Sequence, residues 1–265
     1  MDNALNNFPR WLLMWLLAGG LFMLGKAAVL FRMKRTGTPW PMWKTLAWFC
    51  AWPGMHARDF DGCGQKCSRS PGIAIVKITA GGILLWGAAR HFDNPLAAGW
   101  CGMIGMILVL HFGIFGLLAI FWQSMGFRAA PIMNTPIASL SVAEFWGRRW
   151  NSGFRDLAHP LLFVPLSHKL GAGAGLWASF AVSGLLHELV ISVPAGGGYG
   201  LPTMYFLIQA LGICVERRGD IALKSRATRW LFTHAFTVLP AFFLFHPPFV
   251  ERVMVPFFRA IGALP

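Results

Sequence analysis

A run of apolar residues at 171–193 constrains the fold of this chain more than any other feature. As a helix with a rise of about 1.5 Å per residue it is about 34 Å long, enough to cross a hydrocarbon core of about 30 Å. It nevertheless carries an imidazole and a carboxyl group, His187 and Glu188. Charged side chains cost about 2.5–3.5 kcal/mol at the centre of a membrane helix and usually mark function. The run therefore predicts a transmembrane helix that contains a functional site.

The composition extends this prediction to the whole chain. Of its 265 residues, 56% are hydrophobic and 12% are charged, whereas a soluble domain has about 25% charged residues. Other long apolar runs lie at 8–31, 71–89, 95–122, 201–215 and 230–245. We therefore expect an all-α polytopic membrane protein, with about six transmembrane helices in a single domain over residues 1–265. The first helix is expected to act as a retained signal anchor.

Two shorter segments are expected at the membrane surface. The segment 40–52 is apolar but too short to span, so we expect an interfacial or re-entrant helix there. Its four tryptophans, a residue type enriched at the headgroup level, are Trp40, Trp43, Trp48 and Trp52. The proline-containing tail after residue 245 predicts one short interfacial helix.

The net charge of +13 follows the predicted membrane topology. With the amino terminus outside and one crossing per long run, the basic loops after the first, third and fifth runs lie inside. The loops after the second and fourth runs lie outside and carry one Lys or Arg between them. This distribution satisfies the positive-inside rule, so the charge indicates membrane orientation and not nucleic-acid binding.

Two cysteines are candidate metal ligands. Cys63 and Cys67 form a C-x3-C pattern in a polar loop, with His56 and Asp59 upstream. Zinc sites usually combine C-x2-C or C-x4-C with a second pair of ligands, and this sequence has no such second pair. No metal site is therefore expected.

A capping box predicts a helix that begins in the basic inside loop. Ser141 can cap the amide of Glu144, and Glu144 can reach back to the amide of Ser141. On a continuous helix, four polar residues would share one face: Glu144, Arg148, Asn151 and Arg155. Trp146 and Trp150 would share another face, giving an amphipathic helix at the membrane interface.

This helix has two interpretations. It can be a surface anchor whose arginines contact lipid phosphates, which the residue pattern alone favours. Alternatively, its arginines bind an anionic substrate such as coenzyme A, while Asn151 enters a reaction site. The arginines concerned are Arg148, Arg149 and Arg155.

The run at 171–193 carries a small residue at every fourth position and ends this pattern in a histidine. The members are Gly171, Gly175, Ser179, Ser183 and His187. The pattern is typical of a close helix-packing seam with His187 as a hydrogen-bonding group, but it also suits a general base that substrate reaches past small side chains. Ser183 lacks the G-x-S-x-G context of a nucleophile. Glu188 points about 100° away from His187 and is expected to pair with an arginine.

Two motifs together resemble a known enzyme family. They are Phe145-Trp-Gly-Arg-Arg-Trp-Asn151 and, further along, Ser183-Gly-Leu-Leu-His-Glu188. With the segments 131–141 and 52–55, they resemble the wax-synthase-like branch of the membrane-bound O-acyltransferases, with a signature region at about 131–188. The resemblance implies a helical membrane fold with a tunnel, which acyl-CoA enters from the cytosolic side.

The resemblance also implies roles for individual residues. His187 matches the family's membrane histidine, the expected general base for direct acyl transfer from acyl-CoA to an acceptor hydroxyl. Asn151 matches the second signature position and would orient substrate or stabilise the oxyanion. The expected substrate-binding residues are Arg148, Arg149, Arg155, Trp150, Ser183 and His111. No cofactor is expected besides the co-substrate acyl-CoA.

The sequence leaves the acceptor open among a long-chain alcohol, a sterol-like or glycerolipid hydroxyl and a sugar, and it does not determine the oligomeric state. We expect membrane lipid around the protein and a bacterial inner membrane as its location. The main alternative is a transporter with a polar pathway through His187 and Glu188 and through Lys26 or Lys77, although no inverted repeat is found. A third interpretation is a non-catalytic assembly protein in the membrane.

Overall fold

The computed structural model describes residues 8–35, 40–60, 70–218 and 225–265, and within these ranges it contains helices and no strands. The all-α prediction is thus confirmed, while Cys63 and Cys67 lie outside the described residues. The first half contains α1 (Arg10–Arg35), α2 (Met42–Ala51), α3 (Gly72–Gly82), α4 (Pro95–Ile107) and α5 (Phe115–Ser124). A π-helical segment, Ile83–Gly87, extends α3, and another, Leu108–Ile114, joins α4 to α5.

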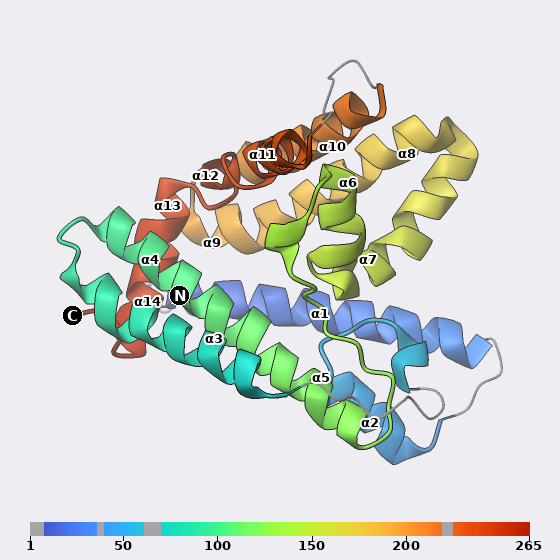
Figure 1. Cartoon of the computed structure of the whole chain (residues 1–265), viewed down its shortest axis with the longest axis horizontal. Helices are drawn as coiled ribbons and strands as arrows, with labels where there is room; N and C mark the ends of the chain where they lie inside the picture. The colour runs from blue at the N-terminus through green and yellow to red at the C-terminus, as the bar shows by residue number, and fades with distance from the viewer. Residues whose placement is uncertain (1–7, 36–39, 61–69, 219–224) are drawn as a thin grey trace, which may run out of the picture.

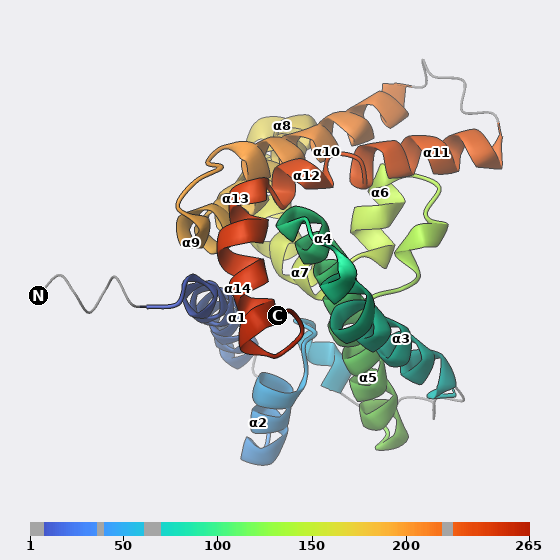
Figure 2. The ribbon, with the colours of Figure 1, turned by 90° about the vertical axis from the view of Figure 1, so that its left-hand side faces the viewer.

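The second half begins with short elements and continues with longer helices. These are α6 (Val142–Glu144), α7 (Ser152–Ala158), α8 (Val164–His187), α9 (Val193–Ala195), α10 (Leu201–Arg218), α11 (Arg226–Thr237), α12 (Ala241–Leu244), α13 (Pro247–Phe249) and α14 (Val255–Ala260). Figure 1 shows α3, α4 and α5 on one side and α8, α10 and α11 on the other, with α6 and α7 between them. The same separation is visible in the orthogonal view of Figure 2.

The described helices include four that are long and apolar enough to cross a membrane. They are Arg10–Arg35, Gly72–His91, Pro95–Ser124 and Ala172–Ala195. A fifth span results if Arg226–Leu244 and Pro247–Ala260, which meet at a bend of 59°, cross as one unit. These helices define an integral membrane protein. The predicted run at 201–215 forms α10 but is not among these spans, so the count of six stays a prediction.

Hydrogen bonds at one end of the bundle join segments that were all expected inside. The amide of Arg128 donates to the carbonyl of Asp59 at 2.8 Å, which joins the loop after α1 to the loop after α5. The amide of Val142 donates to the carboxylate of Glu216, near the end of α10, at 2.6 Å. Three expected inside segments therefore meet at the same end of the molecule.

The opposite end joins the segments that were expected outside. Arg10, at the start of α1, donates to the carbonyl of Ala195 at 2.7 Å, where α9 ends. Arg90, at the end of the second span, donates to the carbonyl of Gly262 at 3.0 Å. The contacts thus group segments that were predicted on the same side of the membrane, and the orientation itself stays a prediction.

A buried lysine attaches α1 to the short helix α2. Lys26 is 0% exposed, and its ammonium group donates to the carbonyls of Trp48 at 2.9 Å and Gly54 at 2.6 Å. The ammonium also lies 3.5 Å from the centroid of the Trp48 ring. Trp48 and Trp52 are buried around this contact, whereas Trp43 is exposed, and the expected headgroup level of these residues stays a prediction. With ten residues, α2 is too short to span a bilayer, as expected.

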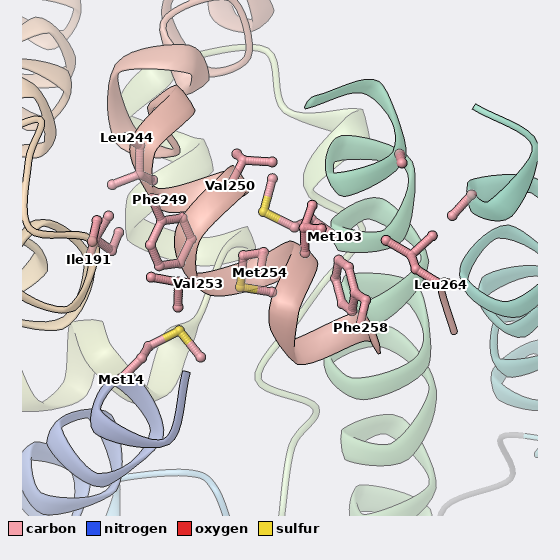
Figure 3. Close-up of a cluster of buried hydrophobic side chains, with 14 of the residues drawn as sticks. Met14, Met103, Ile191, Leu244, Phe249, Val250, Val253, Met254, Phe258 and Leu264 are labelled. Atoms are coloured by element: carbon pink, nitrogen blue, oxygen red, sulfur yellow. The ribbon is translucent and has the colours of Figure 1, made fainter. Parts of the chain in front are cut away.

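The C-terminal tail is a core element, so the prediction of an interfacial helix there was wrong. Val250, Val253 and Phe258 are completely buried. Figure 3 shows this segment between Met14 of α1 and Met103 of α4, among other buried side chains. The contact with α4 is close because that helix presents glycines: a Cβ at Gly102 would lie 2.6 Å from the Phe258 ring. Residues 250, 253, 254 and 258 form the apolar face of this tail.

We predict that Lys26→Met destabilises the protein, because it leaves two buried carbonyls without a donor, each costing about 1–3 kcal/mol. The measurement is thermal unfolding in detergent. Lys34→Met is the matched control, because Lys34 lies exposed near the end of the same helix. Equal midpoints for Lys26→Met and the parent would contradict the structural role of Lys26.

Candidate functional site

The signature segment starts at the N-cap that the sequence predicts. The Ser141 hydroxyl accepts a hydrogen bond from the amide of Glu144 at 2.8 Å. The Glu144 carboxylate, however, accepts from the amide of Leu140 at 2.8 Å and not from that of Ser141. The second hydrogen bond of the capping box therefore comes from the amide of Leu140, one residue before the predicted donor Ser141.

The predicted continuous helix is interrupted at Asn151. After α6, a π-helical segment, Phe145–Arg149, ends the first helical part, and Trp150 is extended. Asn151 has a left-handed backbone, with φ 42° and ψ 63°, and its side-chain oxygen accepts from the amide of Phe154 at 3.2 Å as the N-cap of α7. Asparagine is one of the few residues that tolerate this backbone, and its short side chain suits the cap. The predicted common face of Glu144, Arg148, Asn151 and Arg155 on one continuous helix was therefore wrong.

The interfacial interpretation of this segment was also wrong, because its apolar residues face the protein. Val142 is completely buried, and Trp146 contacts Phe206 of α10 with ring centroids 5.6 Å apart. Trp150 instead stacks on Phe145, with centroids 5.6 Å apart and an interplanar angle of 11°. The two tryptophans share Phe145, whose ring centroid also lies 5.2 Å from that of Trp146, but only Trp146 reaches Phe206.

The small-residue seam of α8 is a ladder of hydrogen bonds to backbone carbonyls four residues earlier. Ser179 donates to the carbonyl of Gly175 at 2.7 Å, and Ser183 donates to that of Ser179 at 3.0 Å. The next step is His187, whose Nδ1 lies 2.7 Å from the carbonyl of Ser183. Ser183 is buried and its hydroxyl is used within the ladder, which further weakens its case as a nucleophile.

The last step of the ladder selects the tautomer of His187. A carbonyl oxygen only accepts hydrogen bonds, so Nδ1 must carry the proton. In the neutral ring, Nε2 then has the free lone pair that a general base requires. The half-buried ring lies 4.4 Å from the Phe206 ring and 6.5 Å from the Phe154 ring, measured between centroids.

Glu188 follows His187 but serves another helix. Its Oε1 accepts hydrogen bonds from the amide of Gly200 at 3.0 Å and from the amide and hydroxyl of Thr203 at 3.1 and 2.9 Å. It therefore caps the start of α10. No arginine pairs with Glu188 in the described part of the chain, so that expectation was wrong.

The fold brings both signature residues against Phe154. Asn151 caps the amide of Phe154, and the ring of Phe154 meets the edge of His187. Neither Phe154 nor Phe206 was predicted from the sequence. The chain has 23 phenylalanines, and the sequence alone does not distinguish these two from the others.

The three candidate arginines have different surroundings. Arg149 forms an ion pair with Glu144 at 2.7 Å, and Arg155 pairs with Asp156 and donates to the carbonyl of Gly147 at 2.8 Å. Arg148 is exposed and interacts electrostatically with Glu144, but among the described residues its guanidinium has no hydrogen bond or direct salt bridge. It is therefore the one of the three whose guanidinium is available to a ligand.

A polar cavity of about 320 Å³ lies beside this segment. The side chains that matter for its charge are His56, Asp59, Arg148, Arg155 and Asp156. Burial raises the pKa of Asp59 to about 6, with His56 opposing this shift and Asp156 adding to it. His56 Nδ1 lies 3.4 Å from the Asp59 carboxylate. The sequence offered His56 and Asp59 only as weak metal ligands, and their place in this cavity was not predicted.

His111 is the remaining candidate from the first half of the chain. His111 lies in the segment Leu108–Ile114 with its ring 5.4 Å from that of Phe115, and its buried Nδ1 has no partner in the described structure. Its neighbour Phe112 contacts Trp150 at 6.4 Å between centroids. His111 thus lies close to the signature segment, but no contact with His187 is found in the described ranges. The ranges described also contain no cluster of three potential metal ligands.

The described helices and their candidate spans define an all-α integral membrane protein. Residues 129–209, which include Asn151 and His187, match the sequence model of the membrane bound O-acyl transferase family. This match confirms the resemblance that the two motifs indicate.

Curated plant proteins share about half of this chain. It is 30% identical over 141 residues to probable long-chain-alcohol O-fatty-acyltransferase 2 of Arabidopsis thaliana, covering 48% of this chain and 41% of that protein. It is 31% identical over 154 residues to acyl-CoA--sterol O-acyltransferase 1 of the same plant, covering 50% and 44%. The matched region thus spans less than half the length of these relatives. Because they are plant proteins, they give no support to the expected bacterial inner membrane.

We predict that Asn151→Ala lowers the unfolding temperature, because alanine provides neither the cap nor an easy left-handed backbone. The two effects together correspond to about 1–3 kcal/mol. Asn151→Asp should unfold close to the parent, because aspartate caps helices equally well and tolerates the same backbone. Thermal unfolding of both variants in detergent tests this difference. Equal destabilisation by the two substitutions would contradict the capping role.

Proposed function

We propose that this protein transfers a fatty acyl group from acyl-CoA to the hydroxyl of a lipophilic alcohol within the membrane. The observation that carries the proposal is the tautomer of His187. Its Nδ1–H is bound to the carbonyl of Ser183, which leaves the Nε2 lone pair for proton abstraction. The match of residues 129–209 to the O-acyl transferase family supports the same chemistry.

In the proposed reaction, Nε2 of His187 takes the proton of the acceptor hydroxyl. The acceptor oxygen then attacks the thioester carbonyl, and the tetrahedral intermediate releases the coenzyme A thiolate when the carbon–sulfur bond breaks. The imidazolium returns its proton to this thiolate, so His187 ends the cycle neutral. The Ser183 carbonyl keeps the Nδ1–H bound throughout, so Nε2 is the nitrogen that takes and returns the proton.

The side-chain amide of Asn151 has its NH2 group available for this reaction. Its Oδ1 accepts from the amide of Phe154, which leaves the Nδ2 group as a donor. We propose that Nδ2 donates to the oxyanion of the tetrahedral intermediate, a role worth about 3–4 kcal/mol for one well-placed donor. The left-handed backbone of Asn151 is the type of local strain that persists at functional sites.

The polar cavity beside Asn151 is the proposed site for the phosphates of coenzyme A. Arg148 lines it and has a free guanidinium in the described structure, so it is assigned the main phosphate contact. Arg149 and Arg155 hold the surrounding backbone through their own pairs and are assigned indirect roles. Trp150, Ser183 and His111 stay proposals as residues near the substrate. No cofactor besides acyl-CoA is proposed.

The acceptor is proposed to be a long-chain alcohol, after the names of several relatives, and a sterol is the second choice. We further propose that residues 1–265 act as one membrane-embedded acyltransferase domain. The transporter alternative would need a shared polar pathway. Lys26, however, is bound to two carbonyls near α2, and Glu188 caps α10, so both groups have separate structural contacts.

We predict that His187→Ala abolishes ester formation because it removes the base. The assay supplies membranes with labelled palmitoyl-CoA and hexadecanol and follows both the ester and free coenzyme A. His168→Ala is the matched control, because His168 is an exposed histidine of the same helix α8. Equal ester formation by His187→Ala and the parent would contradict the proposed base. If the parent forms an ester from cholesterol but not from hexadecanol, the proposed acceptor is a sterol and not a long-chain alcohol.

Burial raises the pKa of Asp59 to about 6. We therefore predict that the KM for acyl-CoA rises as the pH increases through this value. Below this pH the Asp59 carboxyl is mainly neutral, and above it a negative charge opposes the bound phosphates. The expected rise is roughly fivefold, which about 1 kcal/mol of repulsion gives.

Asp59→Asn is the control for this pH dependence. The substrate's own phosphate also titrates near pH 6, so the relevant quantity is the difference between the parent and Asp59→Asn. The variant should bind acyl-CoA with a flatter pH profile. Identical profiles for the two proteins would exclude Asp59 from the phosphate site.

A further inference from the structure

A completely buried amide side chain connects three elements next to the proposed site. Gln209 of α10 is 0% exposed. Its Nε2 donates to the carbonyl of Phe236 at 2.7 Å, near the end of α11, and to the carbonyl of Tyr205 at 3.2 Å. Its Oε1 accepts from the indole N–H of Trp146 at 3.2 Å. Gln209 thus joins α10, α11 and the signature segment through one amide group.

The partners permit only one orientation of this amide. Two of them are carbonyl oxygens, which only accept, and the third is an indole N–H, which only donates. Rotating the amide by 180° would place Oε1 against the carbonyls and Nε2 against the indole, and all three hydrogen bonds would be lost. The Gln209 side chain therefore presents its oxygen to position 146, where the indole N–H of Trp146 is the donor.

Trp146 transmits this connection to His187. The ring of Trp146 lies 5.6 Å from that of Phe206, and the ring of Phe206 lies 4.4 Å from His187. Trp146 also contacts Phe180 of α8 at 6.0 Å between centroids. Five residues after Trp146 the same segment reaches Asn151. The position of Trp146 therefore affects both residues of the proposed reaction.

We propose that Gln209 is a positioning residue of the acyl transfer, which acts by fixing Trp146 between the Asn151 segment and the helix that carries His187. The inference rests on the proposed function. Gln209 does not touch substrate in this scheme. It fixes the Trp146 and Phe206 rings, and these determine the position of the His187 imidazole relative to Asn151.

The kinetic experiment compares Gln209→Met with Tyr205→Phe. Tyr205 makes the other side-chain hydrogen bond from α10 to α11, from its hydroxyl to the carbonyl of Thr237 at 3.0 Å. Tyr205→Phe removes that bond but leaves the bond between Gln209 and Trp146. We expect Gln209→Met to lower kcat by about ten- to a hundredfold at little change in the KM for acyl-CoA. Tyr205→Phe should keep the parent kcat per mole of folded protein.

A second measurement does not depend on enzymatic activity. Diethyl pyrocarbonate modifies neutral imidazole, and mass spectrometry of the peptide that contains His187 gives the rate. We expect a several-fold change in this rate in Gln209→Met and none in Tyr205→Phe. If the parent forms no ester, the proposed function is wrong. The modification rate of His187 then tests by itself whether Gln209 positions His187.

Two results would overturn the inference. One is a His187 modification rate in Gln209→Met equal to that of the parent. The other is an equal loss of kcat in Gln209→Met and Tyr205→Phe, which would show a general weakening of the contact between α10 and α11. If Gln209→Met does not fold, Trp146→Phe replaces it, because this variant removes the indole donor but keeps an aromatic ring, and the same outcomes apply.

Discussion

Hydrogen bonding of polar groups inside an apolar molecule is the constraint on which the rest of this structure depends. In hydrocarbon surroundings water does not compensate an unpaired donor or acceptor, so each polar side chain needs partners within the protein. Lys26 meets this need with two backbone carbonyls, and Gln209 meets it with two carbonyls and an indole. The contacts of Lys26, and those of Gln209 with Phe236 and Trp146, join elements that are distant in the sequence, whereas the Tyr205 carbonyl belongs to α10 itself. The polar groups thus determine which helices lie together as much as the apolar faces do.

The same constraint places His187 in the proposed reaction. Its ring is the last step of a ladder in which small side chains donate to carbonyls four residues earlier. This ladder holds one ring nitrogen and leaves the other free, so the same arrangement serves as a packing seam and suits the proposed base. The seam and base interpretations of the α8 pattern are therefore compatible. Glu188, one residue later, is used to hold α10, which carries Phe206 against the imidazole.

Irregular helix geometry contributes the remaining part of the site. Within the described ranges, π-helical segments occur beside several candidate residues, including Phe145–Arg149 before Asn151 and Glu188–Ser192 after His187. Such segments are frequent at functional sites because they change the direction of side chains relative to a regular helix. The regular 3.6-residue period placed Arg148 and Asn151 on one face of a continuous helix. The break at Trp150 and Asn151 divides that face, and only Arg148 and Arg155 of the original set line the polar cavity.

The sequence by itself determined the membrane class, the main apolar helices, the N-cap at Ser141 and the two motifs that carry the family resemblance. These properties depend on composition, local hydrogen bonding and residue spacing, which do not require knowledge of distant contacts. Only the tertiary structure decided that the C-terminal tail is buried, that Arg148 is the free arginine, and that Phe154 and Phe206 surround His187. Those outcomes depend on which helices pack together. An apolar helix in a membrane protein has several faces of similar hydrophobicity, so its sequence does not specify its neighbours.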